Sequence, residues 1–244
     1  MLVGVALLGL AGVTFAGDEA PAVASAGRVR QYVFDMESAY KKVHDYTAVF
    51  YKQERVKGAL QPTEQIELKF RKPLSVYMKW AGDVNPGQEA IYVAGWNGDQ
   101  TRAHKGSFPD VTVNLRPTSA MAMRGNRHPI TEAGFGHTIG LVVHDARRSE
   151  ENPDDGTEYV DLGDATVHGA ASRCLEQRVP AAAASHYYAA RARVCFDVRT
   201  KMPTRVSVWD AQDQLLEDYG YAQTKLDVGL TDLDFDPSNP AYHF

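Results

Sequence analysis

Residues 63–80 read TEQIELKFRKPLSVYMKW and contain two alternating segments divided by Pro73. In the first segment Ile66, Leu68 and Phe70 share one face, because successive side chains of a strand point to opposite sides. Proline lacks the N–H that a central strand needs, so Pro73 ends this segment. The stretch therefore predicts two strands with a common apolar face, which the second strand extends with Leu74, Val76, Met78 and Trp80.

Similar alternating segments lie on both sides of this pair, at about 46–56, 89–96 and 100–105. Asn97-Gly98 precedes the last of them, and an Asn-Gly pair between alternating runs is a strong hairpin signal. Phe50 joins the apolar face from the first segment. The sequence predicts an antiparallel meander with one apolar, aromatic wall and one partly solvated wall.

Two helices are expected beside the meander. Apolar residues recur at three- and four-residue steps from Val29 to Tyr46, which predicts an amphipathic helix. A second helix is expected over 129–148. There Gly134, Gly136 and Gly140 each weaken the helix by up to about 1 kcal/mol relative to alanine. We interpret this helix either as a movable lid over the apolar wall or as ordinary core packing.

The second half of the chain returns to alternating β-forming segments after a polar turn. The tail, 232–244, has too many Asp, Asn and Pro residues for regular structure, yet its apolar side chains suggest that it packs down. No linker rich in Pro or Gly divides residues 27–244, so we expect one domain there. The strands expected before the tail are 158–162, 171–179, 188–197, 204–209 and 214–223.

The first 16 residues carry no charge and end in Thr14-Phe15-Ala16. This pattern predicts a secretory signal peptide over 1–16, followed by a flexible leader over 17–26. An uncleaved membrane anchor is the alternative. No cysteine lies near the cut, so attachment of a lipid there is not expected. The sequence predicts a periplasmic protein that is exported and not lipid-anchored.

The chain has two cysteines, Cys174 and Cys195, each in an expected strand. An exported protein can keep a structural disulfide, which is the favoured interpretation, and two free buried thiols are the alternative. The formal net charge is -5. This charge gives no electrostatic footprint for nucleic acid, so nucleic acid is not an expected partner.

Sequence motifs of common enzymes are missing: there is no G-x-S-x-G, no phosphate-binding G-x-x-x-x-G-K-S/T and no dinucleotide fingerprint. His137 and His144 would stand about 10 Å apart along the second helix, too far for one metal ion. The remaining histidines, His128 among them, are isolated in sequence. We expect no catalytic residues, no metal site and no cofactor.

Four stretches carry a resemblance to known proteins. They are Asp45 to Gly58 with KQER at 52–55, KFRKPLSVYMKW at 69–80, GQEAIY at 87–92, and the C-terminal Asp234-Phe235 with NPAY at 239–242. Together they resemble an uncharacterised family of secreted bacterial proteins near the LolA-like (periplasmic lipoprotein carrier) fold. The resemblance implies an α+β domain in which a strongly curved antiparallel sheet, an incomplete β-barrel, wraps around helices. In that fold the concave apolar face holds acyl chains.

The expected function is that of a non-enzymatic carrier or binding protein for a lipid, an acylated protein or another apolar ligand. The alternatives are an envelope protein-interaction or stress-sensor module, and an enzyme with an unrecognised site. Lys52 and Glu54 share the face of Phe50 and are expected to form a rim for a ligand headgroup, unless they belong to a solvated outer face with ion pairs. The residues expected to bind the ligand are Phe50, Ile66, Leu68, Phe70, Val76, Met78, Trp80 and Tyr92.

Overall fold

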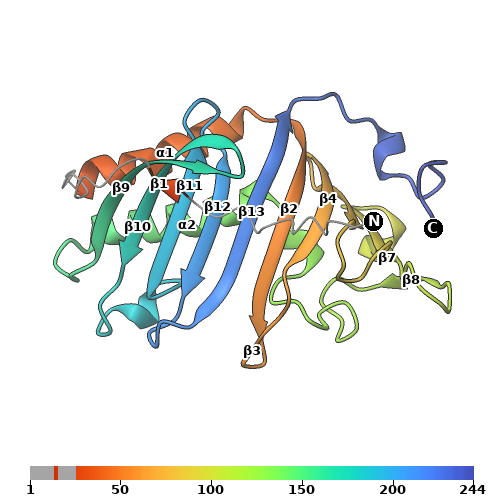
Figure 1. Ribbon diagram of the computed structural model, residues 1–244, viewed down its shortest axis with the longest axis horizontal. Coiled ribbons are helices and arrows are strands. Elements are labelled where there is room, and N and C mark those ends of the chain that lie inside the picture. The colour runs from red at the N-terminus through yellow and green to blue at the C-terminus, as the bar shows by residue number, and fades with distance from the viewer. Residues whose placement is uncertain (1–13, 16–25) are drawn as a thin grey trace, which may run out of the picture.

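A computed structural model describes residues 14–15 and 26–244 and shows one curved sheet with two helices behind it (Figure 1). The strands follow the order β1-β9-β10-β11-β12-β13-β2-β4-β5-β6-β7-β8, all neighbours are antiparallel, and β3 pairs with β2. In the described part of the chain the two end strands, β1 and β8, do not pair with each other. The predicted incomplete barrel is confirmed.

The elements have the following bounds. The helices are α1 (Ala26–Lys41) and α2 (Phe135–Glu151), with short 3-10 helices η1 (Asn97–Asp99), η2 (Ile130–Glu132), η3 (Ala184–His186) and η4 (Asp232–Phe235). The strands are β1 (Thr14–Phe15), β2 (Asp45–Val56), β3 (Ala59–Leu60), β4 (Glu64–Arg71), β5 (Ser75–Trp80), β6 (Glu89–Val93), β7 (Thr101–His104), β8 (Thr112–Leu115), β9 (Glu158–Val167), β10 (Ala170–Arg178), β11 (Arg191–Asp197), β12 (Pro203–Trp209) and β13 (Leu215–Leu226).

The pairing of β2 with β13 joins the first meander to the C-terminal strands. Phe50 in β2 lies opposite Tyr221 on one side and opposite Ile66 in β4 on the other. The Phe50 and Tyr221 rings stack with their centroids 4.9 Å apart. An aromatic row therefore crosses the middle of the sheet on its concave face.

Helix α1 ends at Lys41, earlier than the predicted end at Tyr46. The Asp45 carboxylate accepts hydrogen bonds from the backbone N–H groups of Val228, Gly229 and Leu230, which follow β13. These long-range bonds hold Asp45 at the start of β2. The helix predicted from the sequence was too long because its apolar spacing continues to Tyr46, which belongs to strand β2.

The second helix begins at Phe135, later than predicted, because Gly134 has a φ of 91° that a helix does not accept. Its buried face contributes Ile139, Val143 and Ala146 to the core. Helix α1 contributes Val29, Val33 and Met36, and both helices pack on the concave face of the sheet.

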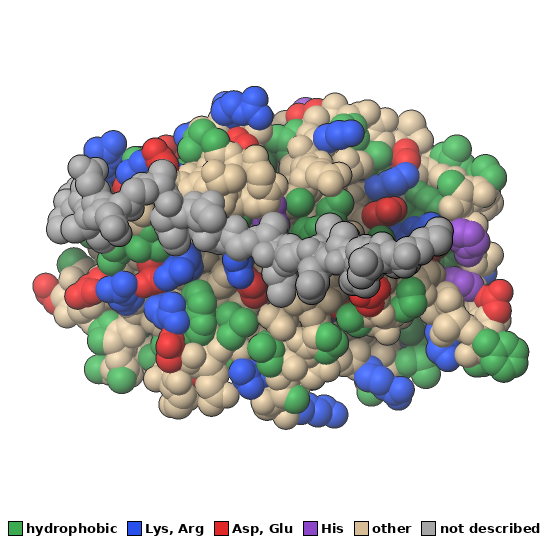
Figure 2. Space-filling model, in the orientation of Figure 1, with side chains coloured by type: hydrophobic (Ala, Val, Ile, Leu, Met, Phe, Trp, Pro, Cys, Tyr) green, Lys and Arg blue, Asp and Glu red, His purple; other side chains and the backbone are tan. Residues whose placement is uncertain are grey.

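The convex face carries charged side chains of both signs among hydrophobic ones (Figure 2). Cross-strand ion pairs hold many of them, such as Arg205 with Asp218 at 2.7 Å and Arg193 with Glu176 at 2.6 Å. Cys174 lies opposite Cys195 in the β10–β11 pair, and the predicted disulfide is confirmed.

The C-terminal tail packs down on the sheet, as expected, and it does so on the convex face. Phe235 in η4 is buried against Tyr77 and Ile91. Lys69 pairs with Asp234 at 2.7 Å, and Arg71 pairs with Asp232 at 2.6 Å. The basic residues of β4 therefore serve to hold the tail.

The predicted signal peptide (1–16) and leader (17–26) lie outside the described residues, apart from Thr14–Phe15, which pairs with β9, and Ala26, which begins α1. Among the described residues, no helix is both long enough and apolar enough to cross a membrane.

Candidate functional site

A cavity of about 590 Å³ lies on the concave face beside the start of α2. Small-molecule sites typically enclose about 300–1,000 Å³. Strands β2, β4, β5, β6, β7, β8 and β13 form one wall, and the segment from 117 to 138 forms the other. The apolar side chains that line the cavity include Phe50, Ile66, Met78, Trp80, Ala90, Val113, Leu115, Met121, Ile130 and Tyr221.

The structure divides the predicted ligand-binding residues into two groups. Phe50, Ile66, Met78 and Trp80 line the cavity. Leu68, Phe70, Val76 and Tyr92 are buried but do not line it.

Packing of α2 explains this division. The Tyr46 ring stacks between Phe70 and Phe135, with centroid distances of 5.1 and 4.3 Å. Phe135, the first residue of α2, thus packs on Tyr46, which packs on Phe70. This end of the apolar wall is therefore part of the protein core. The other end of the same wall, at the start of β4 and the end of β5, lines the cavity with Ile66 and Trp80.

Sequence reasoning missed the far wall of the cavity. Met121 lies in a stretch without a regular strand, and such a stretch gives no periodicity from which a buried face can be read. Ile130 stands near the start of the helix predicted over 129–148, where the structure has the short helix η2 instead. The available signal was the presence of apolar residues in an otherwise polar loop.

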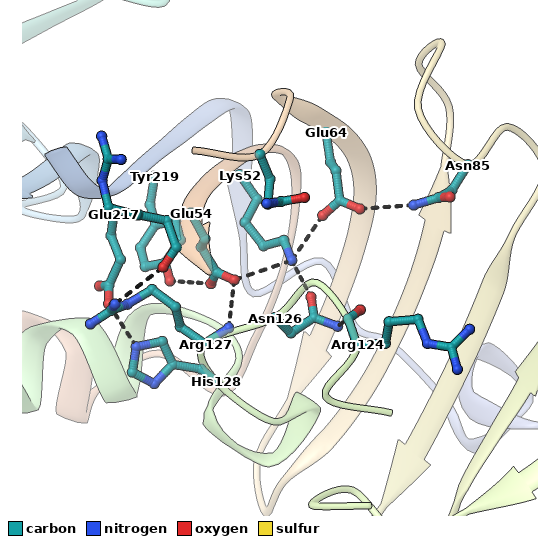
Figure 3. A network of polar contacts seen from close by, with 12 residues as sticks. Lys52, Glu54, Glu64, Asn85, Arg124, Asn126, Arg127, His128, Glu217 and Tyr219 are labelled. Carbon is teal, nitrogen blue, oxygen red and sulfur yellow. Dashed lines mark hydrogen bonds and ion pairs between the residues drawn. The ribbon is translucent and has the colours of Figure 1, made fainter. Parts of the chain in front are cut away.

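A polar network forms one side of the cavity (Figure 3). The Lys52 ammonium lies 2.8 Å from Glu64 and 3.6 Å from Glu54, and it donates a hydrogen bond to Asn126. Glu64 also accepts the indole N–H of Trp80 at 3.0 Å. Lys52 and Glu54 face the cavity beside Phe50, and both are paired within the protein.

The network continues to β13 through Glu54 and Glu217. The hydroxyl of Tyr219 donates to Glu54 at 2.5 Å, and the backbone N–H of Arg127 donates to the other Glu54 oxygen at 2.8 Å. Buried Glu217 accepts hydrogen bonds from Arg127 Nε at 2.6 Å and from His128 Nε2 at 2.9 Å. These bonds tie the far wall of the cavity to the sheet.

The contacts within this network favour the ionised forms of Glu217 and His128. Burial opposes ionisation of Glu217, but hydrogen bonds from His128 and Tyr188 outweigh it and lower the pKa of Glu217. Burial also opposes the charged form of His128, but Glu217 and Glu132 raise the pKa of His128 overall. The hydroxyl of Tyr188 donates to Glu217 at 2.6 Å and completes the cluster.

Three residues of this wall could hold a metal ion. His128, Glu132 and His137 each offer one ligand atom, and these atoms lie within 4.8 Å of one another. The sequence argument tested the spacing of His137 and His144 and treated His128 as isolated. The helix begins only after His128, and the turn at Gly134 brings His128 beside His137. The pattern His-x3-Glu-x4-His was the signal that could have found the group.

The sheet, the helices and the cavity define an α+β half-barrel protein with the LolA-like fold, as the sequence predicted. The chain belongs to the family described as "Protein of unknown function (DUF1571)", whose model matches residues 43–244. No curated protein sequence matches the chain.

Several solved structures are similar to this chain at low sequence identity. Lipoprotein LppX of Mycobacterium tuberculosis is 12% identical, with a TM-score of 0.51 over 87% of this chain and 100% of its own. The MucA/MucB complex of Pseudomonas aeruginosa contains a chain that is 11% identical, with a TM-score of 0.48 over 86% of this chain and 60% of its own. The LolA superfamily protein NE2245 of Nitrosomonas europaea is 8% identical, with a TM-score of 0.33 over 87% of this chain and 98% of its own. The likeness to LppX shows a shared fold.

Proposed function

We propose that this protein is a periplasmic, non-enzymatic carrier or binding protein for an apolar ligand, either a lipid or the acyl chain of an acylated protein. The cavity of about 590 Å³ carries the proposal, because Phe50, Met78 and Trp80 line it and are not covered there by the helices. Apolar side chains that face a cavity lack packing partners, and an acyl chain would supply them.

Burial of an acyl chain supplies the driving force. Each CH₂ group that leaves water gains about 0.8 kcal/mol. Ordering of the ligand and of the cavity wall opposes this gain. The network around Lys52 and Glu54 lines one side of the same cavity and is placed to orient a polar headgroup. Val111 and Met121 line the cavity and are also exposed, at 42% and 59%, so they mark its mouth.

A matched pair of variants tests the proposal. Val113 lines the cavity, Val198 lies in the turn after β11, and both side chains are 37% exposed. Binding of a fluorescent fatty acid to the full chain is measured for Val113→Asp and Val198→Asp. The charge at 113 is expected to weaken binding at least about 10-fold, since a carboxylate in an apolar site is costly, and Val198→Asp is expected to bind normally.

Two further variants, Met78→Asp and Trp80→Asp, place the charge deeper in the cavity and are expected to abolish binding while circular dichroism shows a folded domain. Unchanged binding in all of the cavity variants would contradict the carrier proposal. Mass spectrometry of natively purified protein identifies the ligand, and extraction of a lipid in stoichiometric amount is the expected result.

One observation favours a second candidate, a protein-interaction module in the envelope. Phe108, in the loop between β7 and β8, is 94% exposed, close in sequence to Val111 at the cavity mouth. An exposed aromatic side chain is typical of a contact site for another protein. A stable protein complex that Phe108→Ser disrupts, in material that carries no lipid, would favour this candidate over the carrier.

A further inference from the structure

The geometry points to a divalent metal site, with Zn²⁺ as the best-suited ion, formed by His128, Glu132 and His137 on the wall of the cavity. This site goes beyond the proposed carrier function and does not depend on it. Two imidazoles and one carboxylate form a donor set that zinc commonly takes in proteins.

The distances among the donor atoms are close to those of a zinc site. Glu132 Oε2 lies 2.7 Å from His128 Nδ1 and 3.5 Å from His137 Nε2. Ligand atoms about 2.0–2.1 Å from a tetrahedral zinc ion are about 3.3 Å apart. Small side-chain rotations are therefore enough to admit the ion between the three residues.

The backbone holds these residues in place from two sides. Glu132 ends η2, and His137 lies in the first turn of α2. Gly134 makes the bend between them, and the Tyr46 hydroxyl accepts the Phe135 backbone N–H at 2.9 Å. The ligands therefore come from elements that are anchored to the sheet.

Glu217 orients the first imidazole. His128 Nε2 donates to the Glu217 carboxylate at 2.9 Å, and Glu217 is itself held by Arg127 and Tyr188. A metal-bound histidine almost always donates its other ring N–H to a carboxylate or a carbonyl. Here that bond leaves His128 Nδ1 directed at Glu132, and a metal ion takes the place of the proton on Nδ1, which is released to water.

The second imidazole supplies an independent observation. Nε2 of His137 is buried and has no hydrogen-bond partner among the described residues. A buried polar atom without a partner costs free energy, because it has lost its hydrogen bonds to water and gained none in the protein. Coordination of a cation by this nitrogen removes the cost. The local charge also favours a cation. Once His128 has lost its Nδ1 proton, Arg127 is the charged ion-pair partner that remains for Glu132 and Glu217 among the described residues.

Three protein ligands leave one position of a tetrahedral ion open. All three residues line the cavity, so a molecule in the cavity can reach this position. The open position suits a water molecule or an anionic oxygen of a carboxylate or phosphate headgroup.

Isothermal titration of the chelator-treated full chain with ZnSO₄ tests the site. We expect one ion per chain, and we expect Glu132→Gln and His137→Ala each to weaken binding at least about 100-fold. His144→Ala is the matched control, because His144 lies on the same helix with an exposed side chain outside the group. It is expected to bind within about 2-fold of the parent protein.

Titration with Co²⁺ gives a second readout, because its visible absorption is intense in four-coordinate tetrahedral sites. We expect this absorption in the parent protein and in His144→Ala, and its loss in His137→Ala. Glu217→Gln, which removes only the orienting charge, is expected to weaken Zn²⁺ binding by about 10- to 100-fold.

Lack of saturable 1:1 binding would overturn the metal site, as would equal binding in the ligand variants and in His144→Ala. Fatty-acid binding measured in the presence of chelator separates the two proposals. Loss of the metal site with normal acyl binding leaves the carrier proposal standing, and the reverse result leaves the metal site standing.

Discussion

The hydroxyl oxygen of Tyr46 lies 2.3 Å from the position that a Cβ atom on Gly134 would occupy. The same hydroxyl accepts the backbone N–H of Phe135. The start of α2 therefore fits on β2 only because residue 134 has no side chain. This contact fixes the boundary between the core under the helix and the cavity beside it.

Gly134 and Gly136, two of the three glycines expected to weaken the second helix, have a different role in the structure. A Cβ atom on Gly136 would lie 2.8 Å from the Tyr40 hydroxyl, whereas one on Gly140 would meet nothing within 4 Å. Gly134 and Gly136 permit close packing, and only Gly140 is a replaceable glycine inside the helix. The cavity is present with α2 packed in the core, so a ligand site does not require α2 to move.

Gly134→Ala and Gly140→Ala should have opposite effects on stability. At 134 the positive φ and the Tyr46 contact make alanine strained, and we expect a loss of about 2–4 kcal/mol in the free energy of unfolding. At 140 alanine should add about 0.5–1 kcal/mol, since it is the better helix former. Urea denaturation measures both, and stabilisation by Gly134→Ala would show that the helix start is not packed as described.

Filling the cavity should change its preference for ligand length. Ala103 in β7 lines the cavity, while Ala170 in β10 is an equally half-buried strand residue away from it. Ala103→Phe is expected to weaken the binding of long fatty acids more than that of short ones, because the ring occupies space that the end of the chain needs. Ala170→Phe should leave the chain-length profile unchanged, and a uniform loss in both variants would contradict the assignment.

The C-terminal tail should stabilise the sheet without affecting the cavity. Phe235 is 4% exposed and packs on Tyr77 and Ile91, while Leu233 in the same short helix is 54% exposed. Phe235→Ala is expected to cost about 3–5 kcal/mol, and Leu233→Ala less than about 0.5 kcal/mol. Thermal unfolding measures the difference. Fatty-acid binding by folded Phe235→Ala should be normal, because the tail lies on the opposite face.

Stability should depend on the ionisation of buried Glu176. Burial opposes its charge, but hydrogen bonds and ion pairs with Arg193 and Arg178 lower the pKa of Glu176 below its usual 4.5. A lowered pKa gives stability that is present above the usual value and is lost as the pH falls through the value in the folded protein. Glu176→Gln is therefore expected to destabilise by about 1–3 kcal/mol at neutral pH.

The difference between Glu176→Gln and the parent protein should shrink as the pH falls below about 4. Urea denaturation at neutral and acidic pH measures it. Glu150→Gln is the control, because Glu150 is exposed and its pair with Arg30 is 3.6 Å long, so the expected effect is below about 0.5 kcal/mol. A pH-independent loss in Glu176→Gln would point to packing instead of charge.

The sequence was sufficient to predict the sheet because its signal is local. Alternation across 63–80 gave the faces of β4 and β5, and placement of Phe50, Lys52 and Glu54 on one face followed from the same two-residue period. The opposite positions of Cys174 and Cys195 agree with the expected disulfide. The faces need only the geometry of a strand, whereas the expected disulfide rested on the two cysteines of an exported chain.

The division of the apolar wall could not be predicted in this way. Phe70 and Met78 lie on the same face, yet Phe70 packs on Tyr46, which Phe135 covers, while Met78 lines the cavity. That difference depends on where α2 begins, which Gly134 and the distant Tyr46 decide together. The same bend brings His128 beside His137, so the candidate metal ligands also depend on a tertiary contact.

The neighbouring positions of β2 and β13 in the sheet have a consequence for biosynthesis. Glu54 and Tyr219, which meet beside the cavity, are 165 positions apart in the chain. Contacts over such long separations form slowly, because the intervening loop must first be closed. A nascent chain therefore lacks this part of the cavity until β13, the last strand of the described residues, has been made. A chain that ends before β13 would leave the apolar face of β2 exposed to chaperones and proteases.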